Sequence, residues 1–242
     1  MRIFSNCREL LSEIMRDVSE QGTIVHPQTM QNQRVADNEE FQTKELLNYS
    51  YCLTSRADQE NLFISNPKQN FYWCKSEFSE RISRSWVNPG KAWLIRKDTW
   101  EPFLSKAGEF CYTYNERLNR YHNLEKIIDE LRVHGDSRQC YLPVFHPRDP
   151  SFIGGKKRVP CTLGYQFIIR NGKMHIIYSQ RSADVFLHFG NDIWLAWELM
   201  EYVAEMVGVE PGFLYHNIAS LHSYRRDWEG LKTCIDQLYE QG

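Results

Sequence analysis

The feature that most constrains the fold of this chain is a β-hairpin in its second half. Two apolar-rich segments, GYQFIIR at 164–170 and KMHIIYS at 173–179, flank the dipeptide Asn171-Gly172. Asn-Gly supplies the two residues with positive φ that a type I′ turn requires, and the twist of that turn matches the strands it joins. The sequence therefore predicts two antiparallel strands joined by a two-residue turn.

Helical patterns lie on both sides of this hairpin. Apolar spacing predicts helices over residues 7–18, 43–53, 118–133, 193–207 and 227–239, and further strands over 140–145 and 213–218. Because strands and helices alternate without a regular βαβ rhythm, we expect an α+β fold with a layered mixed sheet and surrounding helices. A chain of 242 residues accommodates this as a single domain, 1–242.

Composition excludes several classes of protein. With 29 basic and 31 acidic residues the net charge is −2, which argues against a nucleic-acid coat or a polybasic membrane binder. No apolar stretch approaches the ~18 residues of a membrane-spanning helix. The seven cysteines form no C-x-x-C pair and no zinc-binding spacing. We therefore expect a cytoplasmic protein with free thiols and no metal site.

Two segments contain groups suited to catalysis and phosphate binding. Cys161 follows the basic segment 156–158, which can lower the pKa of a thiol and favour its nucleophilic form. The alternative is a buried cysteine that only packs. Arg181 and Ser182 can hold a phosphate by charge-assisted hydrogen bonds, or can form an ordinary solvated turn.

Three more segments leave a binding role and a structural role open. Asn191 and Asp192 precede a helix, where either can cap the helix or face a ligand. His222 and Tyr224 point to the same side of an extended segment and can bind a sugar hydroxyl, or can be half-buried surface. Glu45 stands at the start of a predicted helix, where an exposed carboxylate is the simplest reading.

The order of these segments resembles the thymidylate synthase superfamily. The string reads Asp136-Ser137-Arg138, Pro160-Cys161, Gln166-Phe167, Gln180-Arg181-Ser182-x-Asp184, a polar residue at 192, and His222-x-Tyr224. The resemblance covers about half the chain, and a string of this length is far more specific than one short motif. Gly190-Asn191-Asp192 and Cys161-Thr162 resemble the phage deoxycytidylate hydroxymethylases more than the synthases, which have Pro-Phe-Asn and Cys-His.

The resemblance implies a homodimeric one-carbon transferase of a bacterial or phage-infected cell. Its substrates are a pyrimidine nucleoside monophosphate and 5,10-methylenetetrahydrofolate. It implies that Cys161 adds to C6 of the pyrimidine, and that Glu45 transfers protons and orders a water molecule. It also implies an active-site tyrosine, for which Tyr112 is the candidate and Tyr114 the rival.

The same resemblance implies a set of binding residues. Arg181 and Ser182 hold the phosphate, together with Arg138 from the partner subunit. The sugar 3′-hydroxyl is held by His222 and Tyr224. Asp184 contacts the pterin ring, and Asn191 and Gln180 make further contacts to the nucleotide.

The residue at 192 indicates which base is bound. Uracil offers O4 as an acceptor and N3–H as a donor, which an asparagine amide satisfies. Cytosine offers the reverse pattern, which suits a carboxylic acid or a carboxylate facing an N3-protonated ring. Burial raises the pKa of a carboxyl group and makes such a shared proton favourable. Asp192 therefore predicts a cytidylate substrate.

Several alternatives stay open on sequence alone. The product can be 5-hydroxymethylcytidylate or, with the folate as hydride donor, 5-methylcytidylate, and the chain can also be a catalytically silent nucleotide-binding homologue. The substrate can be dCMP or CMP, because the phosphate and sugar region departs from the family pattern. Gln139 replaces a second arginine, His26 lies in a loop that usually supplies a basic residue, and His188 replaces a glycine.

Overall fold

The fold is built around one mixed β-sheet. A computed structural model describes residues 1–30, 33–64, 66–154 and 158–240. The helices are α1 (Cys7–Gln21), α2 (Asn61–Ile64), α3 (Phe71–Arg81), α4 (Lys97–Trp100), α5 (Tyr114–Asn119), α6 (Asn123–Val133), α7 (Phe189–Val207) and α8 (Trp228–Glu240). The strands are β1 (Arg2–Phe4), β2 (Thr23–Val25), β3 (Thr29–Met30), β4 (Gln33–Arg34), β5 (Thr43–Leu53), β6 (Tyr141–Pro143), β7 (Thr162–Arg170), β8 (Lys173–Gln180), β9 (Ala183–Asp184) and β10 (Glu210–Tyr224).

The main sheet has the strand order β1-β5-β10-β8-β7-β6, with β2 beside β5 and β9 beside β10. The pairs β1/β5, β10/β8 and β10/β9 are parallel, whereas β10/β5, β2/β5, β7/β8 and β6/β7 are antiparallel. Together with the helices packed on it, this mixed sheet confirms the expected α+β class. Within the described residues, no helix combines the length and apolar character that crossing a membrane requires.

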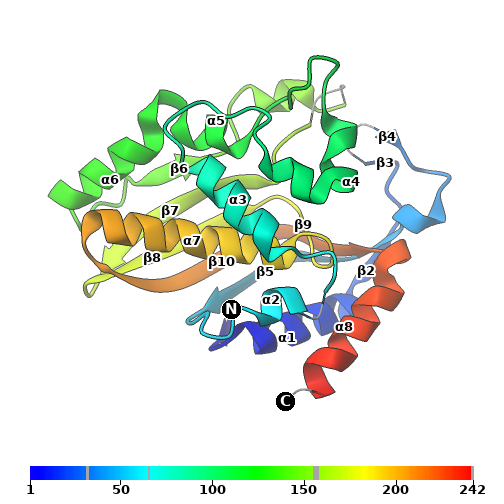
Figure 1. The fold of residues 1–242 in the computed structure, drawn as a ribbon. Coiled ribbons are helices and arrows are strands. Elements are labelled where there is room, and N and C mark those ends of the chain that lie inside the picture. Colours follow the sequence, from blue (N-terminus) through cyan, green and yellow to red (C-terminus); the bar gives the residue numbers. More distant parts are fainter. Residues whose placement is uncertain (31–32, 65, 155–157, 241–242) are drawn as a thin grey trace.

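One face of the sheet is buried beneath helices. On β8, Met174, Ile176 and Tyr178 are buried, whereas the alternate residues His175 and Ile177 are only half-buried. Helix α7 contacts β8 and β10, and α1 contacts β5 and β10. Figure 1 shows α7 and α3 crossing in front of the strands. The period-two burial means that only one side of the sheet is fully buried in this chain.

The predicted hairpin is confirmed. Strands β7 and β8 pair in antiparallel register as far as Arg170 and Lys173, and the turn residues Asn171 and Gly172 have φ values of 53° and 73°. The helices predicted over 7–18, 193–207 and 227–239 are also present, as α1, α7 and α8. The predicted strands 140–145 and 213–218 correspond to the shorter β6 and the longer β10.

The helix predicted over 43–53 is wrong, because this segment is strand β5. It pairs with β10 along nearly its whole length and lies between β10 and β1 in the sheet. Its second half alternates large residues with polar ones, Tyr49, Ser50 and Tyr51, which is a strand period. The adjacent Leu46 and Leu47 mimic a helical face, but Leu47 is exposed. Pairing on both sides therefore overrides the local pattern.

The helix predicted over 118–133 is confirmed from residue 123 onward, as α6, but it is not continuous at its start. The helix breaks between α5 and α6 at Tyr121 and His122, whose φ values of 56° and 58° are left-handed. A left-handed residue cannot continue a right-handed α-helix. Helix α5 starts earlier than predicted, at a capping box in which Thr113 and Glu116 exchange hydrogen bonds.

Candidate active site

Strand pairing brings distant segments together at one end of the sheet. Gln180, the last residue of β8, lies opposite Thr162 of β7 on one side and Ile218 of β10 on the other. Further along β10, His222 lies opposite Asp184 of β9. Cys161 directly precedes β7, so the sheet register places the thiol beside the segment that follows β8.

A cleft of about 1310 Å³ opens at this end of the sheet. It exceeds the ~1,000 Å³ upper range of pockets for one small ligand. The predicted site residues that line it are Cys161, Asp192, Tyr112, Arg181, Ser182, His222, Tyr224, Gln180 and Asp184. The cleft therefore joins most of the residues that the sequence string singled out.

The Cys161 thiol faces an arginine. The Arg181 Nη2 atom lies 3.8 Å from Cys161 Sγ, and the same guanidinium donates to the carbonyls of Val159 and Pro160 at 2.9 Å. Burial raises the pKa of Cys161 and outweighs the opposing charges of Arg181 and Arg158. The expected low pKa is therefore not found in the free protein. Of the basic segment expected to lower it, Lys156 and Lys157 lie outside the described residues.

Asp192 lies in the first turn of α7 and is held by Gln180. Its Oδ2 atom accepts a hydrogen bond of 3.0 Å from the Gln180 amide. Burial raises the pKa of Asp192 to about 6, against the lowering influence of that hydrogen bond and of Arg81 and Arg96. The carboxyl group can therefore hold or release a proton near neutral pH, as a shared proton with cytosine requires.

Two residues that line the cleft, Asp184 and His222, have buried polar atoms without a hydrogen-bond partner among the described residues. Asp184 Oδ1 accepts from the backbone amides of Phe186 and Leu187, but Oδ2 has no partner among the described residues. The ring atom Nδ1 of His222 is likewise buried and unpaired there. Unpaired buried polar atoms are costly unless a ligand satisfies them. Both residues are therefore candidates for contact with a bound ligand.

Both candidate tyrosines line the cleft. The Tyr114 hydroxyl is 2.9 Å from Thr162 Oγ1, the residue after the thiol, and that oxygen is also 2.9 Å from the Tyr178 hydroxyl. Burial raises the pKa of Tyr112 to about 12, and the Arg117 guanidinium lies 4.8 Å from its ring centre. Tyr112 and Tyr114 therefore both stay candidates, and Tyr114 has the direct link to the Cys161 segment.

Three predicted site residues do not line the cleft. Glu45 is on β5 rather than on a helix, and its carboxylate accepts a short hydrogen bond from Ser220. Arg138 is exposed, and its backbone carbonyl accepts from Gln166. Asn191 is fully buried, and its Oδ1 accepts from the Asn70 amide at 3.0 Å rather than capping α7, whose N-cap is His188.

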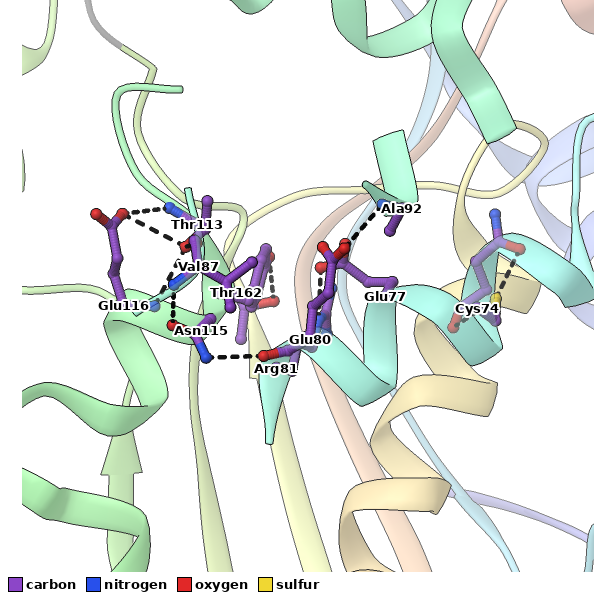
Figure 2. Close-up of polar contacts among 12 residues, drawn as sticks. Cys74, Glu77, Glu80, Arg81, Val87, Ala92, Thr113, Asn115, Glu116 and Thr162 are labelled. Carbon is purple, nitrogen blue, oxygen red and sulfur yellow. Dashed lines mark hydrogen bonds and ion pairs between the residues drawn. The ribbon is translucent and has the colours of Figure 1, made fainter. Parts of the chain in front are cut away.

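Among the charged residues of the cleft that the sequence did not reveal, Glu77 and Arg81 come from α3. Glu77 Oε1 accepts from the Nε atom of the buried Arg81 at 2.8 Å, and Arg81 lies 3.9 Å from the centre of the Tyr114 ring. Figure 2 shows Glu77, Glu80 and Arg81 along one helix beside the Thr113–Glu116 capping box. An i, i+4 charge pair is common on solvated helices, so the sequence offered no signal that this one is buried.

Helix α3 is tied to the start of α5. The Asn115 side chain donates to the carbonyls of Glu80 and Ser83 at 2.7 and 2.8 Å and accepts from the Val87 amide. These bonds fix Tyr114 relative to Arg81.

His188, the departure from glycine noted above, also lines the cleft. Arg96 Nη1 lies 3.3 Å from its Nδ1 atom, and the Trp100 ring lies 5.7 Å from the imidazole. Burial lowers the pKa of His188 to about 3, so the ring is neutral. No group of three His, Cys, Asp or Glu residues suited to a metal ion occurs in the described part of the chain.

Fold and cleft together define a class of α+β protein in which a thiol meets several carboxyl and guanidinium groups in a cleft at the end of a mixed sheet. The sequence model of the family "Thymidylate synthase" matches residues 14–241. The chain belongs to the thymidylate synthase family, a family of folate-dependent one-carbon transferases that act on pyrimidine nucleotides.

Known relatives agree with this membership. The chain is 31% identical over 133 residues to a "Putative thymidylate synthase" of Methanosarcina acetivorans, covering 53% of this chain and 60% of the relative. It is 32% identical over 144 residues to a protein of the same name from Methanocaldococcus jannaschii, covering 54% of this chain and 65% of that one. The aligned part thus spans about three fifths of the length of these relatives.

The fold itself has a counterpart among solved structures. The crystal structure of thymidylate synthase from T4 phage superimposes with a TM-score of 0.72 and 21% sequence identity, over 91% of this chain and 78% of that one. Similarity at this level of identity concerns the fold.

Proposed function

We propose that this protein is a cytidylate 5-hydroxymethylase that uses 5,10-methylenetetrahydrofolate. The observation that carries the proposal is Asp192, a carboxyl group with a pKa of about 6 in the same cleft as the Cys161 thiol. A site that hydrogen-bonds one base rejects the base that leaves its polar groups unpaired. The substrate is a cytidylate, dCMP or CMP.

The cleft supplies a binding group for each part of the two substrates. Arg181 and Ser182 bind the phosphate, while His222 and Tyr224 bind the sugar, so that the unpaired His222 Nδ1 gains a partner. Asp184 binds the pterin ring of the folate, whose N–H groups suit the unpaired Oδ2 atom.

Catalysis starts at the thiol. The Cys161 sulfur adds to C6 of the pyrimidine as a thiolate, and the electron pair of the C5=C6 bond makes C5 nucleophilic. The folate supplies the one-carbon unit that C5 attacks. Loss of tetrahydrofolate and of the C5 proton leaves an exocyclic methylene, to which water adds as the thiolate leaves. Arg181, 3.8 Å from the sulfur, favours the charged thiolate.

A carboxylate in the cleft moves the protons. Glu45 does not line the cleft, so we move the role assigned to it to Glu77, which does and which is oriented by Arg81. General acid–base groups need to reach the proton they transfer, and geometry decides first.

A homodimer completes the site in this proposal. The face of the sheet opposite α7 offers half-buried residues such as Ile177 and Tyr215, and a second copy can pack there. Arg138 is exposed and absent from the cleft of its own chain, as expected for an arginine that reaches the phosphate of the partner site.

A methylated product is the second candidate. The relatives in the two archaea are named as thymidylate synthases, whose name denotes a methylated product, and this favours hydride transfer as the last step. Dihydrofolate accompanies methylation only. A catalytically silent nucleotide-binding homologue is the third reading.

The test is to incubate the protein with methylenetetrahydrofolate and, separately, CMP, dCMP, UMP and dUMP, and to read the product mass. We expect a hydroxymethyl product from one cytidylate and none from the uridylates. Asp192→Asn should shift the preference toward a uridylate. A methyl product supports the second candidate, and a wild-type preference for a uridylate overturns the proposal.

A further inference from the structure

Asp192 is the end of a chain of buried hydrogen bonds. Gln180 Nε2 donates to Asp192 Oδ2 at 3.0 Å, and Gln180 Oε1 is 2.9 Å from His216 Nε2. On its other side, His216 Nδ1 is 2.8 Å from the Tyr51 hydroxyl. Tyr51 and His216 are fully buried and Gln180 nearly so.

The direction of each proton in this chain follows from chemistry. Burial lowers the pKa of His216 to about 3, so its imidazole is neutral and carries one proton. The Gln180 carbonyl oxygen can only accept, so that proton lies on His216 Nε2. His216 Nδ1 then accepts from the Tyr51 hydroxyl. Donation runs from Tyr51 through His216 and Gln180 to Asp192.

This direction matters because a carboxylic acid alone does not discriminate between pyrimidines. Cytosine needs an acceptor opposite N4 and a donor opposite N3, and uracil needs the reverse. A neutral acid satisfies either base by moving its proton from one oxygen to the other. Selectivity therefore requires that the proton of Asp192 be confined to one oxygen.

We propose that Tyr51, His216 and Gln180 act as positioning residues that confine this proton to Asp192 Oδ1 and thereby select the amino-pyrimidine. The inference rests on the proposed function. The Gln180 N–H makes Oδ2 an acceptor, which suits the amino group of cytosine. Among the hydrogen bonds of the described residues, Oδ1 has none, so its proton is free to face N3. A uracil requires the proton on Oδ2, where it competes with the Gln180 N–H.

The chain resists rearrangement because rings surround its centre. The rings of Tyr178 and Phe189 lie nearly parallel to the His216 ring, with centres 4.4 and 6.0 Å away, and the Tyr51 ring packs edge-on at 5.3 Å. Turning the Gln180 amide over would place its N–H against the His216 N–H, unless the His216 proton moved to Nδ1. The Tyr51 hydroxyl would then lose its acceptor, because His216 Nδ1 is its only hydrogen-bond partner among the described residues. Unpaired buried donors are strongly disfavoured.

The experiment measures a specificity ratio, which is kcat/KM for the preferred cytidylate divided by kcat/KM for the matching uridylate. It compares this ratio in wild type, Tyr51→Phe and His216→Phe. His216→Phe keeps a ring between its neighbours but frees the Gln180 amide to turn over. We expect the ratio to fall about tenfold or more in His216→Phe and by less in Tyr51→Phe, mainly through cytidylate. Tyr49→Phe is the matched control, because its hydroxyl donates to Asp17 at 2.7 Å on the same strand, and its ratio should not change.

A spectroscopic readout separates positioning from general damage. Nitrogen-15 NMR of the free protein should show a neutral His216 with its proton on Nε2, and Tyr51→Phe should weaken that preference. Variants that retain the wild-type ratio, or a wild-type His216 protonated on Nδ1, overturn the inference while leaving the proposed function intact. A wild type that prefers no cytidylate overturns the proposed function, and the inference with it.

Discussion

In the proposed function a single carboxyl group, Asp192, contacts the base, and its raised pKa affects the stability of the protein as well. The native pKa of about 6 lies above the ordinary value of 3.8. Below about pH 4 the group is protonated in both the folded and the unfolded protein. As pH rises through 6, the folded protein must bury a charge, so stability is lost.

Asp192→Asn removes this pH dependence. We expect the free energy of unfolding of the variant, relative to wild type, to rise by about 2–3 kcal/mol between pH 4 and pH 7, from the size of the pKa shift. Denaturant unfolding of both proteins, without ligands, at the two pH values measures it. If the two proteins differ in free energy of unfolding by the same amount at pH 4 and pH 7, the raised pKa of Asp192 is contradicted.

Matched variants of Glu77 and Glu45 test which of the two carboxylates transfers protons. Glu77→Gln keeps an acceptor for Arg81 but cannot exchange a proton, so kcat should fall by ~10²–10⁴. Glu45→Gln keeps an acceptor for Ser220 outside the cleft, so kcat should stay within about twofold. Steady-state kinetics with the cytidylate measures both values of kcat. If kcat falls more in Glu45→Gln than in Glu77→Gln, Glu45 is the proton-transfer residue.

The sequence predicted residues whose order along the chain is informative and missed those whose burial depends on packing. Cys161, Asp192 and His222 belong to such a string. Strand register brings Cys161 and His222 to one end of the sheet, and a hydrogen bond from Gln180 joins Asp192 of α7 to it. Arg81 is recognisable as part of the site only once α3 is seen against α5, because its side chain is buried by Tyr114 and Glu77.

Among the elements, α5 shows how a cap can control an active site. The Thr113 hydroxyl accepts from the Glu116 amide and donates to the Val87 carbonyl at 2.7 Å, directly before Tyr114. Thr113→Ala should lower the free energy of unfolding by about 1–2 kcal/mol and raise KM, since Tyr114 loses its anchor. Thr233→Ala, on the exposed side of α8, is the control and should change stability by less than about 0.5 kcal/mol.

Elements with strong local signals were predictable, and those set by long-range pairing were not. The Asn171-Gly172 turn specifies its hairpin within a few residues. Strand β5 has no local strand signal that outweighs its helical one, because its partners β10 and β1 lie near the two ends of the chain. The break at Tyr121 and His122 interrupts an apolar pattern that continues across it, so periodicity does not reveal it.

On the scale of the whole molecule, the proposed dimer makes a prediction that a monomer cannot satisfy. Arg138→Ala and Cys161→Ala should each abolish turnover, and an equal mixture of the two, after subunit exchange, should regain about a quarter of the wild-type activity. The mixed dimers then hold one site with both groups intact. Activity that stays absent in the mixture, while sedimentation shows exchanged dimers, contradicts the contribution of Arg138 across the interface.

The central claim is that the Cys161 sulfur adds to C6 of a cytosine ring held by Asp192, and tritium release from C5 measures it most directly. With methylenetetrahydrofolate present, we predict that wild-type protein releases tritium to water from [5-³H]CMP or [5-³H]dCMP. Cys161→Ala should release none, and the matching uridylates should be poor substrates. Release by Cys161→Ala, or faster release from a uridylate by wild type, would contradict the account.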